Sequence, residues 1–265
     1  MTAGKNGEQL KVRGNKRLPR EGMERILVRG VNWIGDAVMT LPAVASIRKT
    51  WPQSHISLLA KPWVADIYRE TGMVDELIMF EEPGRHAGPA GKLLLAAELR
   101  QKRFAMAILL QNAIEAAIIS RLAKIPIRAG YDADARGWLL THAVHRSRAI
   151  RQVHQIHYYL EMVKALGCCD PGPGLHLDLR AETAALADTW LPRPAGGDGL
   201  FVGIAPGATY GPAKRWPVER FRAVATALHR QYREAVIILF GSEQDREVTD
   251  VIAATIPDRC LNLAG

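Results

Sequence analysis

The sequence predicts an α/β protein with two Rossmann-like units on parallel sheets, the second of them incomplete. Three features support this fold class. Short apolar runs alternate with segments of helical period, a Pro/Gly-rich stretch at 168–200 divides the chain, and the last apolar run, 260–265, ends the sequence. Because strands that alternate with helices are joined by crossovers, we expect parallel sheets with helices on both faces.

Length and composition agree with this division. The 265 residues are 48% hydrophobic and 23% charged, as in ordinary globular proteins, and the length suits two domains of about 100–150 residues. We expect a disordered basic leader at 1–22, an N-terminal domain at 23–170, a linker region at 171–198 and a partial C-terminal domain at 199–265.

The N-terminal half opens with a strand at 25–28 and a helix at 36–51, in which Pro42 lies early enough to be tolerated. Further apolar runs predict strands at 55–60, 76–80, 104–110 and 127–131. Segments of helical period between them predict helices at 62–70, 91–102 and 113–124.

The C-terminal half repeats this pattern after one short helix at 181–190. We expect strands at 200–206, 235–241 and 260–265, with helices at 217–232 and 242–257. Pro217 suits position N1 of its helix, where a missing N–H costs nothing. A sheet of three strands would have a bare edge. Either a partner covers that edge or the chain is a fragment, and we favour the fragment.

The charge balance is basic, with 35 Lys and Arg against 27 Asp and Glu. It favours an anionic partner, which could be nucleic acid, a membrane surface or a phosphorylated small molecule. The chain shows no nucleic-acid-binding motif and no interleaved stacking aromatics, so no nucleic-acid partner is expected. The leader lacks the apolar segment of a secretory signal, and the three cysteines are interpreted as reduced thiols of a cytoplasmic protein.

The loop at 207–216 combines features of a phosphate site. It follows a strand, Gly207 and Gly211 free its backbone, and Lys214 adds a positive charge just before a helix. Loop amides, a helix N-terminus and an ammonium group together suit a diphosphate. The alternative is a Gly/Pro turn with solvated cations, and the pattern alone does not decide between the two.

Two acidic residues lie at the starts of expected helices. Asp245 could accept hydrogen bonds from ribose hydroxyls or simply cap its helix, and the pattern favours the cap. Asp36 could accept a proton as a general base, with Gly35 letting the backbone approach a substrate. The competing interpretation makes Asp36 the N-cap of its helix.

No metal or cofactor site is expected. His154 and His157 share a helical face, but no further ligands lie near them in the sequence, so both are interpreted as structural or surface residues. One Asp-X-Asp match, at 132–134, falls in a loop of the N-terminal half and carries little weight.

Two segments carry a family resemblance: RGVNWIGDAVMTLPAV at 29–44 and APGATYGPAKRWP at 205–217. Together they resemble the ADP-heptose:lipopolysaccharide heptosyltransferases of glycosyltransferase family 9, the type II branch above all. The likeness runs from about Met23 to Gly265. It implies the GT-B fold, with a nucleotide-sugar cleft between two Rossmann-like halves, and transfer with inversion at the anomeric carbon.

The resemblance also implies roles for single residues. Asp36 matches the catalytic base and Lys214 the lysine that binds the donor diphosphate. The remaining matches are Gly207 and Thr209 in the phosphate loop, Asp245 near the adenosine ribose, Asn32 and Gly35 in the turn that carries Asp36, and Arg136 on the acceptor side.

The partners implied are an ADP-heptose donor and a heptosyl-Kdo-lipid A acceptor, which is an anionic glycolipid. The protein is then expected in the cytoplasm, in peripheral contact with the inner membrane. Family members continue past the motif at 262–265 into a further donor-binding segment. The alternative to an active transferase is therefore a non-catalytic remnant that at most binds nucleotide.

Overall fold

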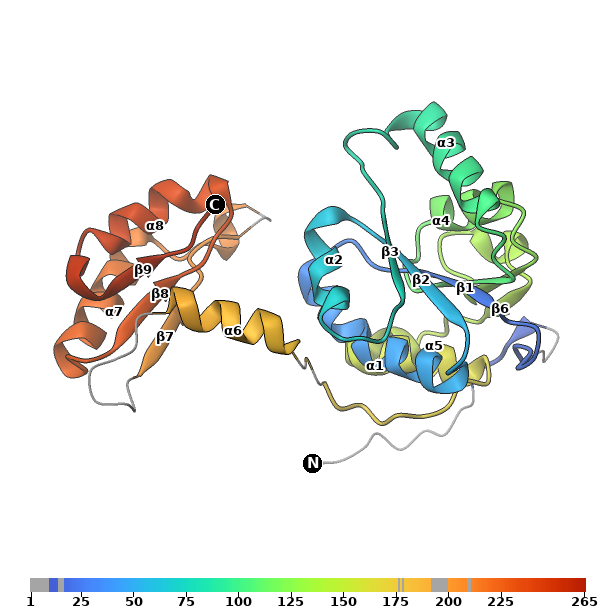
Figure 1. The fold of residues 1–265 in the computed structure, drawn as a ribbon, viewed down its shortest axis with the longest axis horizontal. Helices are drawn as coiled ribbons and strands as arrows, with labels where there is room; N and C mark the ends of the chain where they lie inside the picture. Colours follow the sequence, from blue (N-terminus) through green and yellow to red (C-terminus); the bar gives the residue numbers. More distant parts are fainter. Residues whose placement is uncertain (1–9, 14–16, 176, 178, 192–199, 209–210) are drawn as a thin grey trace. The chain divides into compact units, whose positions relative to one another are not determined.

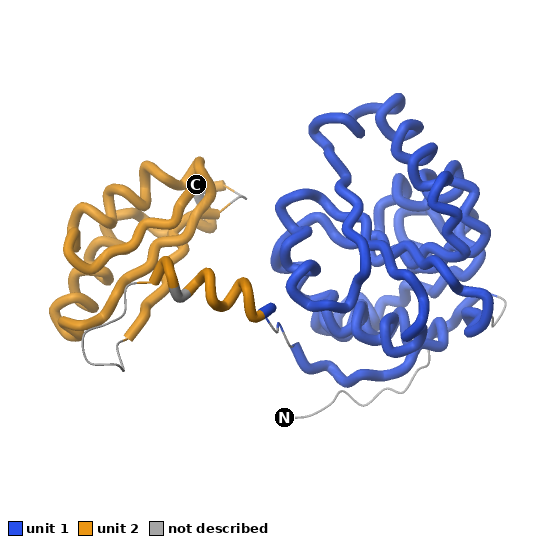
Figure 2. Tube along the Cα trace, in the orientation of Figure 1, with its two compact units in different colours: residues 1–180 blue, residues 181–265 orange. Residues whose placement is uncertain are grey.

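The computed structural model describes residues 10–13, 17–175, 177, 179–191, 200–208 and 211–265. The chain divides into two compact units, Met1–Arg180 and Ala181–Gly265, which Figure 2 shows in different colours. Each unit has a parallel sheet of its own, so each is described by itself below.

The first unit contains a parallel sheet of six strands in the order β3-β2-β1-β4-β5-β6 (Figure 1). The strands are β1 (Arg25–Arg29), β2 (His55–Ala60), β3 (Glu76–Met79), β4 (Met106–Leu109), β5 (Ile127–Tyr131) and β6 (His142–Val144). The first five confirm the sequence prediction. The short strand β6 was not predicted.

Helices cover both faces of this sheet, as the sequence predicted. They are α1 (Ile34–Thr50), α2 (Pro62–Arg69), α3 (Gly88–Gln101), α4 (Ile114–Leu122) and α5 (Gln155–Ala165). Side chains alternate along each strand. Ile26 and Val28 therefore join a core with α1, α2 and α5, whereas Leu27 joins the core under α3 and α4.

The second unit is smaller. After α6 (Ala181–Trp190) come β7 (Phe201–Ile204), α7 (Val218–Gln231), β8 (Val236–Leu239), α8 (Arg246–Ala253) and β9 (Cys260–Asn262). The three strands pair in parallel in the order β7-β8-β9. Their core includes Ile204, Ile237, Leu239 and Ile252.

Two details of this unit correct the prediction. Pro217 occupies the N-cap position of α7 rather than N1, with φ −55° and ψ 139°. The predicted helix at 242–257 is divided, because a 3₁₀ turn at Glu243–Asp245 precedes α8. Both changes lie in loops at the carboxyl edge of the sheet, where local hydrogen bonding sets the helix start.

This topology fixes where sites can lie. In a doubly wound sheet, ligands bind beyond the carboxyl ends of the strands where the strand order reverses. In the first unit that point lies between β1 and β4, so the turn after β1 is the favoured position. In the second unit the loops after β7 and β8 meet at one edge. Within the described residues, none of the helices is long and apolar enough to cross a bilayer.

Candidate active site

The turn between β1 and α1 places Asp36 in the first turn of a helix. The N-cap of α1 is Trp33, whose backbone is extended and whose side chain makes no capping hydrogen bond. The alternative in which Asp36 is the N-cap is therefore wrong. Its carboxylate instead lies in the third helical position, at the carboxyl edge of β1 and only partly exposed.

Partial burial changes the acidity of the Asp36 carboxyl. Burial raises the pKa of the Asp36 carboxyl above its ordinary value, because desolvation penalises the charged state. The carboxylate makes no hydrogen bond or ion pair with any residue that the structure describes. The buried hydroxyls of Tyr68 and Tyr159 lie within its electrostatic reach. A carboxylate of this kind is suited to accept a proton from a substrate.

Arg29 holds the turn from inside the protein. Its side chain is buried, and its Nη2 donates to Asn32 Oδ1 at 2.9 Å. Its Nη1 donates to the carbonyls of Gly30 and Leu59. The indole N–H of Trp63 donates to the Asn32 carbonyl at 2.8 Å. Asn32 is thus fixed through both its side chain and its backbone. In the predicted donor contact, the donor would have to bind Asn32 alongside Arg29 and Trp63.

A cluster of charges lies beside Arg29. Its guanidinium packs 5.0 Å from the centre of the Phe80 ring, and Lys61 and Lys92 pack on the same ring at 4.2 and 4.4 Å. Glu82 pairs with both lysines. The two lysines therefore share one carboxylate, and burial lowers the pKa of Arg29 to about 10. In this region only the Gly-bearing turn before α1 was singled out from the sequence, and this cluster of charges was not.

Arg136 does not lie where an acceptor could reach it. Its side chain is 0% exposed. The guanidinium donates to the main-chain carbonyls of Tyr131 at 2.8 Å and of Leu109 at 3.4 Å, and also to the carbonyl of Gln111. It therefore joins the carboxyl ends of β4 and β5. The acceptor contact implied by the resemblance does not fit this placement.

A second arginine, Arg146, also lies at the carboxyl edge of this sheet and was not singled out from the sequence. The backbone N–H of Arg146 donates to Asp132 Oδ1 at 2.8 Å, and its guanidinium lies 5.7 Å from the centre of the Tyr158 ring. Among the described residues, its buried Nε has no hydrogen-bond partner, and neither does the side-chain oxygen of Asn112. The Asn112 amide donates to the Tyr158 hydroxyl at 2.8 Å. Two unsatisfied polar atoms thus lie close to one tyrosine.

In the second unit, Asp245 packs against Gly207. A β-carbon on residue 207 would come within 2.5 Å of Asp245 Oδ2. That oxygen accepts hydrogen bonds from Ser242 N at 2.9 Å and Ser242 Oγ at 2.7 Å, and these bonds lower the pKa of the Asp245 carboxyl. The carboxylate therefore caps the turn before α8, as the pattern favoured. Its other oxygen lies 4.0 Å from Arg215 Nη2.

The predicted phosphate loop is only partly described. Lys214 ends a 3₁₀ turn, and its side chain is exposed. Arg215 Nε donates to the Ala208 carbonyl at 3.1 Å, which closes the loop on itself. The uncapped start of α7 follows at Pro217. Thr209, also expected in this loop, lies outside the described residues.

His154 and the Asp-X-Asp match have structural roles, and His157 is an exposed residue of α5. His154 is the N-cap of α5 and accepts a hydrogen bond from Ile156 N. Asp132 binds the backbone of Arg146 and the ring of His145. Across the described part of the chain, no three His, Cys, Asp or Glu side chains are grouped to hold a metal ion.

Comparison with known proteins identifies the class. The family model for glycosyltransferase family 9 (heptosyltransferase) matches residues 93–265, well over half of the chain. The chain therefore belongs to this family and is a glycosyltransferase. Its two units are the Rossmann-like halves of a GT-B-type fold, as the sequence predicted.

Individual relatives lead to the lipopolysaccharide enzymes. The chain is 29% identical to lipooligosaccharide heptosyltransferase 2 of Haemophilus influenzae, over 91% of the chain and 71% of that protein. It is 28% identical to lipopolysaccharide heptosyltransferase 2 of Salmonella typhimurium, with the same coverage. The solved structure of Escherichia coli ADP-heptose LPS heptosyltransferase II superimposes with a TM-score of 0.72 at 25% identity, covering 91% of this chain and 72% of that one.

Proposed function

We propose that this protein transfers L-glycero-D-manno-heptose from ADP-heptose to the heptosyl-Kdo-lipid A inner core of lipopolysaccharide, with inversion at the anomeric carbon. The observation that carries the proposal is the half-buried Asp36 carboxylate at the switch point of the first sheet, which has no hydrogen-bond or ion-pair partner among the described residues. The names of the relatives support the donor and the acceptor class.

Asp36 acts as the general base in the proposed reaction. An acceptor hydroxyl attacks C1 of the heptose while its proton passes to the Asp36 carboxylate. The bond between C1 and the β-phosphate oxygen breaks, and ADP leaves with the electron pair. Attack from the face opposite the leaving group inverts the configuration. The raised pKa of Asp36 brings it nearer the operating pH, which improves a general base.

The loop after β7 is proposed to hold the donor diphosphate. Lys214 supplies positive charge, and the start of α7 supplies backbone N–H groups without a side-chain cap. Both favour the ADP anion as the bond breaks. Thr209 and Gly35 are proposed as further donor contacts. Asn32 would contact the donor through the part of its amide that does not bind Arg29. Asp245 would bind the ribose through Oδ1.

On the acceptor side we propose Arg146 in place of Arg136. The side chains of Arg146 and Asn112 are partly exposed, so an anionic sugar could contact them, whereas Arg136 is 0% exposed. Arg136 then acts as a positioning residue, because it holds the ends of β4 and β5 that carry this edge. The acceptor is a membrane glycolipid, so the protein is proposed to work in the cytoplasm at the inner membrane surface.

The test is a product assay with a matched charge control. The chain is incubated with ADP-heptose and a Kdo-bearing acceptor, and heptosylated product is followed by mass spectrometry and its anomeric configuration by NMR. Lys214→Ala should weaken ADP binding at least tenfold, since a charge-assisted contact is lost. Arg230→Gln, an exposed charge at the end of α7, should leave binding unchanged.

The alternative function makes a different prediction in the same assay. If calorimetry shows ADP binding and no heptosylated product forms, the chain is a nucleotide-binding remnant. If neither binding nor product is observed, both functions are excluded for this chain.

A further inference from the structure

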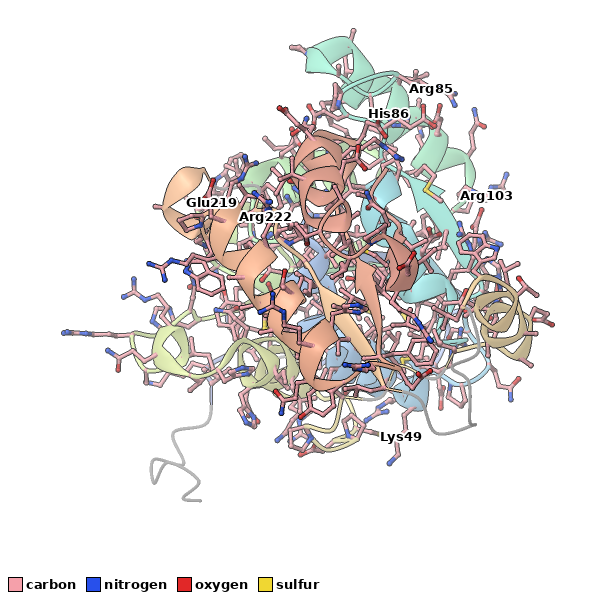
Figure 3. All side chains as sticks on the ribbon, turned by 90° about the vertical axis from the view of Figure 1, so that its left-hand side faces the viewer. Lys49, Arg85, His86, Arg103, Glu219 and Arg222 are labelled. Atoms are coloured by element: carbon pink, nitrogen blue, oxygen red, sulfur yellow. The ribbon has the colours of Figure 1, made fainter. Side chains whose placement is uncertain are left out.

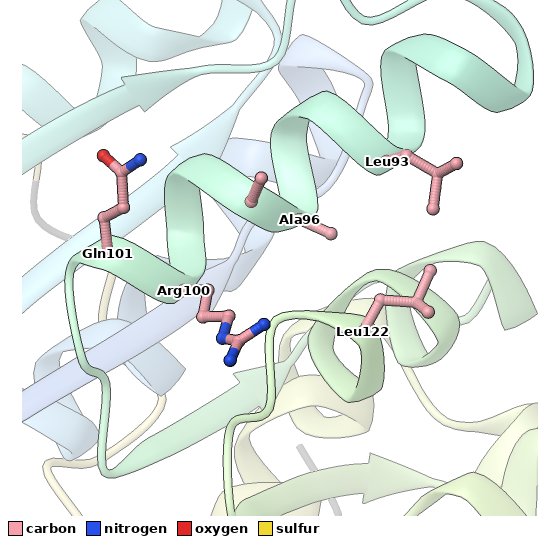
Figure 4. Close-up of a pocket in the computed structure, with 6 residues that line it drawn as sticks. Leu93, Ala96, Arg100, Gln101 and Leu122 are labelled. Carbon is pink, nitrogen blue, oxygen red and sulfur yellow. The ribbon is translucent and has the colours of Figure 1, made fainter.

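An apolar groove runs between α3 and α4 on the outer face of the first unit. It has a volume of about 480 Å³ and is lined by Leu93, Ala97, Arg100 and Leu122, among others. Figure 4 shows Leu93, Ala96 and Arg100 on one helix and Leu122 on the neighbouring helix. On α3 the lining residues are three or four positions apart, so they form one stripe.

Large apolar side chains on both helices face away from the protein core. Leu93 is 57% exposed, Leu122 45% and Ile118 40%. The opposite sides of the same helices are buried in the core, where Leu95 and Leu99 of α3 pack against the sheet. Each helix is thus apolar on two sides, and only one of them is covered within the described residues. Exposed apolar surface of this kind is typical of interaction sites.

The polar surroundings of the groove are strongly basic. Residues 88–128 contain seven Lys and Arg against two Glu. Both glutamates are already paired, Glu98 with Arg85 and Glu115 with Lys92. Four exposed cations of this segment have no ion-pair partner among the described residues: Arg100, which lines the groove, and Arg103, Arg121 and Lys124. Arg103, just after α3, is labelled in Figure 3.

We propose that the α3–α4 groove docks the protein onto an anionic lipid surface. Exposed leucine and isoleucine side chains enter the boundary of the acyl chains, while the surrounding cations contact lipid phosphates, as in interfacial amphipathic helices. Each basic residue near such a surface strengthens binding about fivefold. The inference rests on the proposed function, in that a glycolipid acceptor requires the enzyme to work at a membrane, but its evidence is this surface alone.

Vesicle co-sedimentation tests the proposal without donor or acceptor. The full chain is mixed with phosphatidylcholine vesicles and with phosphatidylcholine–phosphatidylglycerol vesicles. Binding is expected only to the anionic vesicles and should weaken as salt is added. Because neither ADP-heptose nor acceptor is present, a failure of heptosyl transfer does not affect the result, and a failure of docking leaves transfer to a soluble acceptor intact.

Two separate variants test the two halves of the surface. Arg100→Gln with Arg121→Gln removes two cations and should weaken anionic-vesicle binding roughly 25-fold. Leu93→Gln with Leu122→Gln keeps the charge and should also weaken binding at least tenfold. All four side chains are exposed, so each variant should fold, with an unchanged melting temperature as the check.

A charge-matched control distinguishes binding through the groove from binding through the net charge of the protein. Arg222→Gln with Arg230→Gln removes two exposed cations from α7, of which Arg222 is labelled in Figure 3, and should retain vesicle binding. The proposal is overturned if the wild type ignores anionic vesicles, or if the control loses as much binding as the groove variants. It is also overturned if the leucine variant abolishes self-association rather than vesicle binding, since the occupant would then be a second copy.

Discussion

Gly207 and Asp245 are in such close contact that the carboxylate occupies the space a β-carbon on residue 207 would need. The two residues follow different strands, β7 and β8, and meet at the carboxyl edge of their sheet. Asp245 is held in place by Ser242. The contact therefore fixes the distance between the proposed phosphate loop and the turn before α8.

We predict that Gly207→Ala destabilises the protein by about 1–3 kcal/mol, as overpacking usually does. Either the loop or the capped turn must move. Urea denaturation measures the loss. The double variant Gly207→Ala with Asp245→Ala should cost clearly less than the sum of the two single variants, because the clash is gone. Strict additivity would show that the contact is unimportant.

Gly35→Ala provides the comparison glycine. Nothing lies within 4 Å of a β-carbon there, and the residue is inside helix α1. Stability should stay the same or rise by up to about 1 kcal/mol, because alanine is the better helix former. A fall of more than that in urea denaturation would contradict the open surroundings that the structure gives Gly35.

The difference in stability between Asp36→Asn and the wild type should depend on pH in a defined direction. Burial raises the pKa of Asp36 in the folded state above its ordinary value of 3.8. The folded state then binds a proton more tightly than the unfolded state, so stability falls as pH rises through this window. The Asn variant removes that cost. Its melting temperature should exceed the wild-type value at neutral pH, and the difference should vanish towards about pH 4. A variant less stable at neutral pH would indicate an overlooked partner of the carboxylate.

Arg136→Lys tests whether this arginine is structural. A lysine cannot reach the carbonyls of Tyr131, Leu109 and Gln111 at once. Leaving buried carbonyls unpaired should cost about 2–4 kcal/mol. Thermal unfolding gives the cost, and Arg146→Lys serves as the comparison, since it should change acceptor KM more than stability. Normal stability of the Arg136 variant with a raised acceptor KM would restore a direct acceptor contact.

The elements of both sheets could be predicted because their signals are local. Apolar runs of four to seven residues and helical spacing located β1 to β5 and β7 to β9. Strand β6 (His142–Val144) was missed because its three residues are flanked by Thr141 and His145, whereas the equally short β9 lies within the longer apolar run 260–265. Pro217 was placed one position too far into its helix, because the helix start depends on backbone angles that proline allows at both positions.

The surroundings of the site depended on tertiary contacts and could not be predicted. An arginine is normally exposed. Arg136 is buried where carbonyls from two separate segments converge on it, those of Leu109 and Gln111 and that of Tyr131. Arg29 is buried where it reaches Gly30, Leu59 and Asn32 together. Neither set of hydrogen-bond partners follows a regular spacing in the sequence, so neither could be predicted. The position of Asp36 after the first strand could be predicted, but its lack of hydrogen-bond and ion-pair partners among the described residues could not.

The central claim is that Asp36 accepts the proton of the acceptor hydroxyl, and the most direct measurement is the single-turnover rate of Asp36→Asn with ADP-heptose and acceptor. The rate should fall about 10²–10⁴-fold, the usual contribution of a general base, with ADP affinity unchanged by calorimetry. A variant that turns over within a factor of a few of the wild type would contradict it.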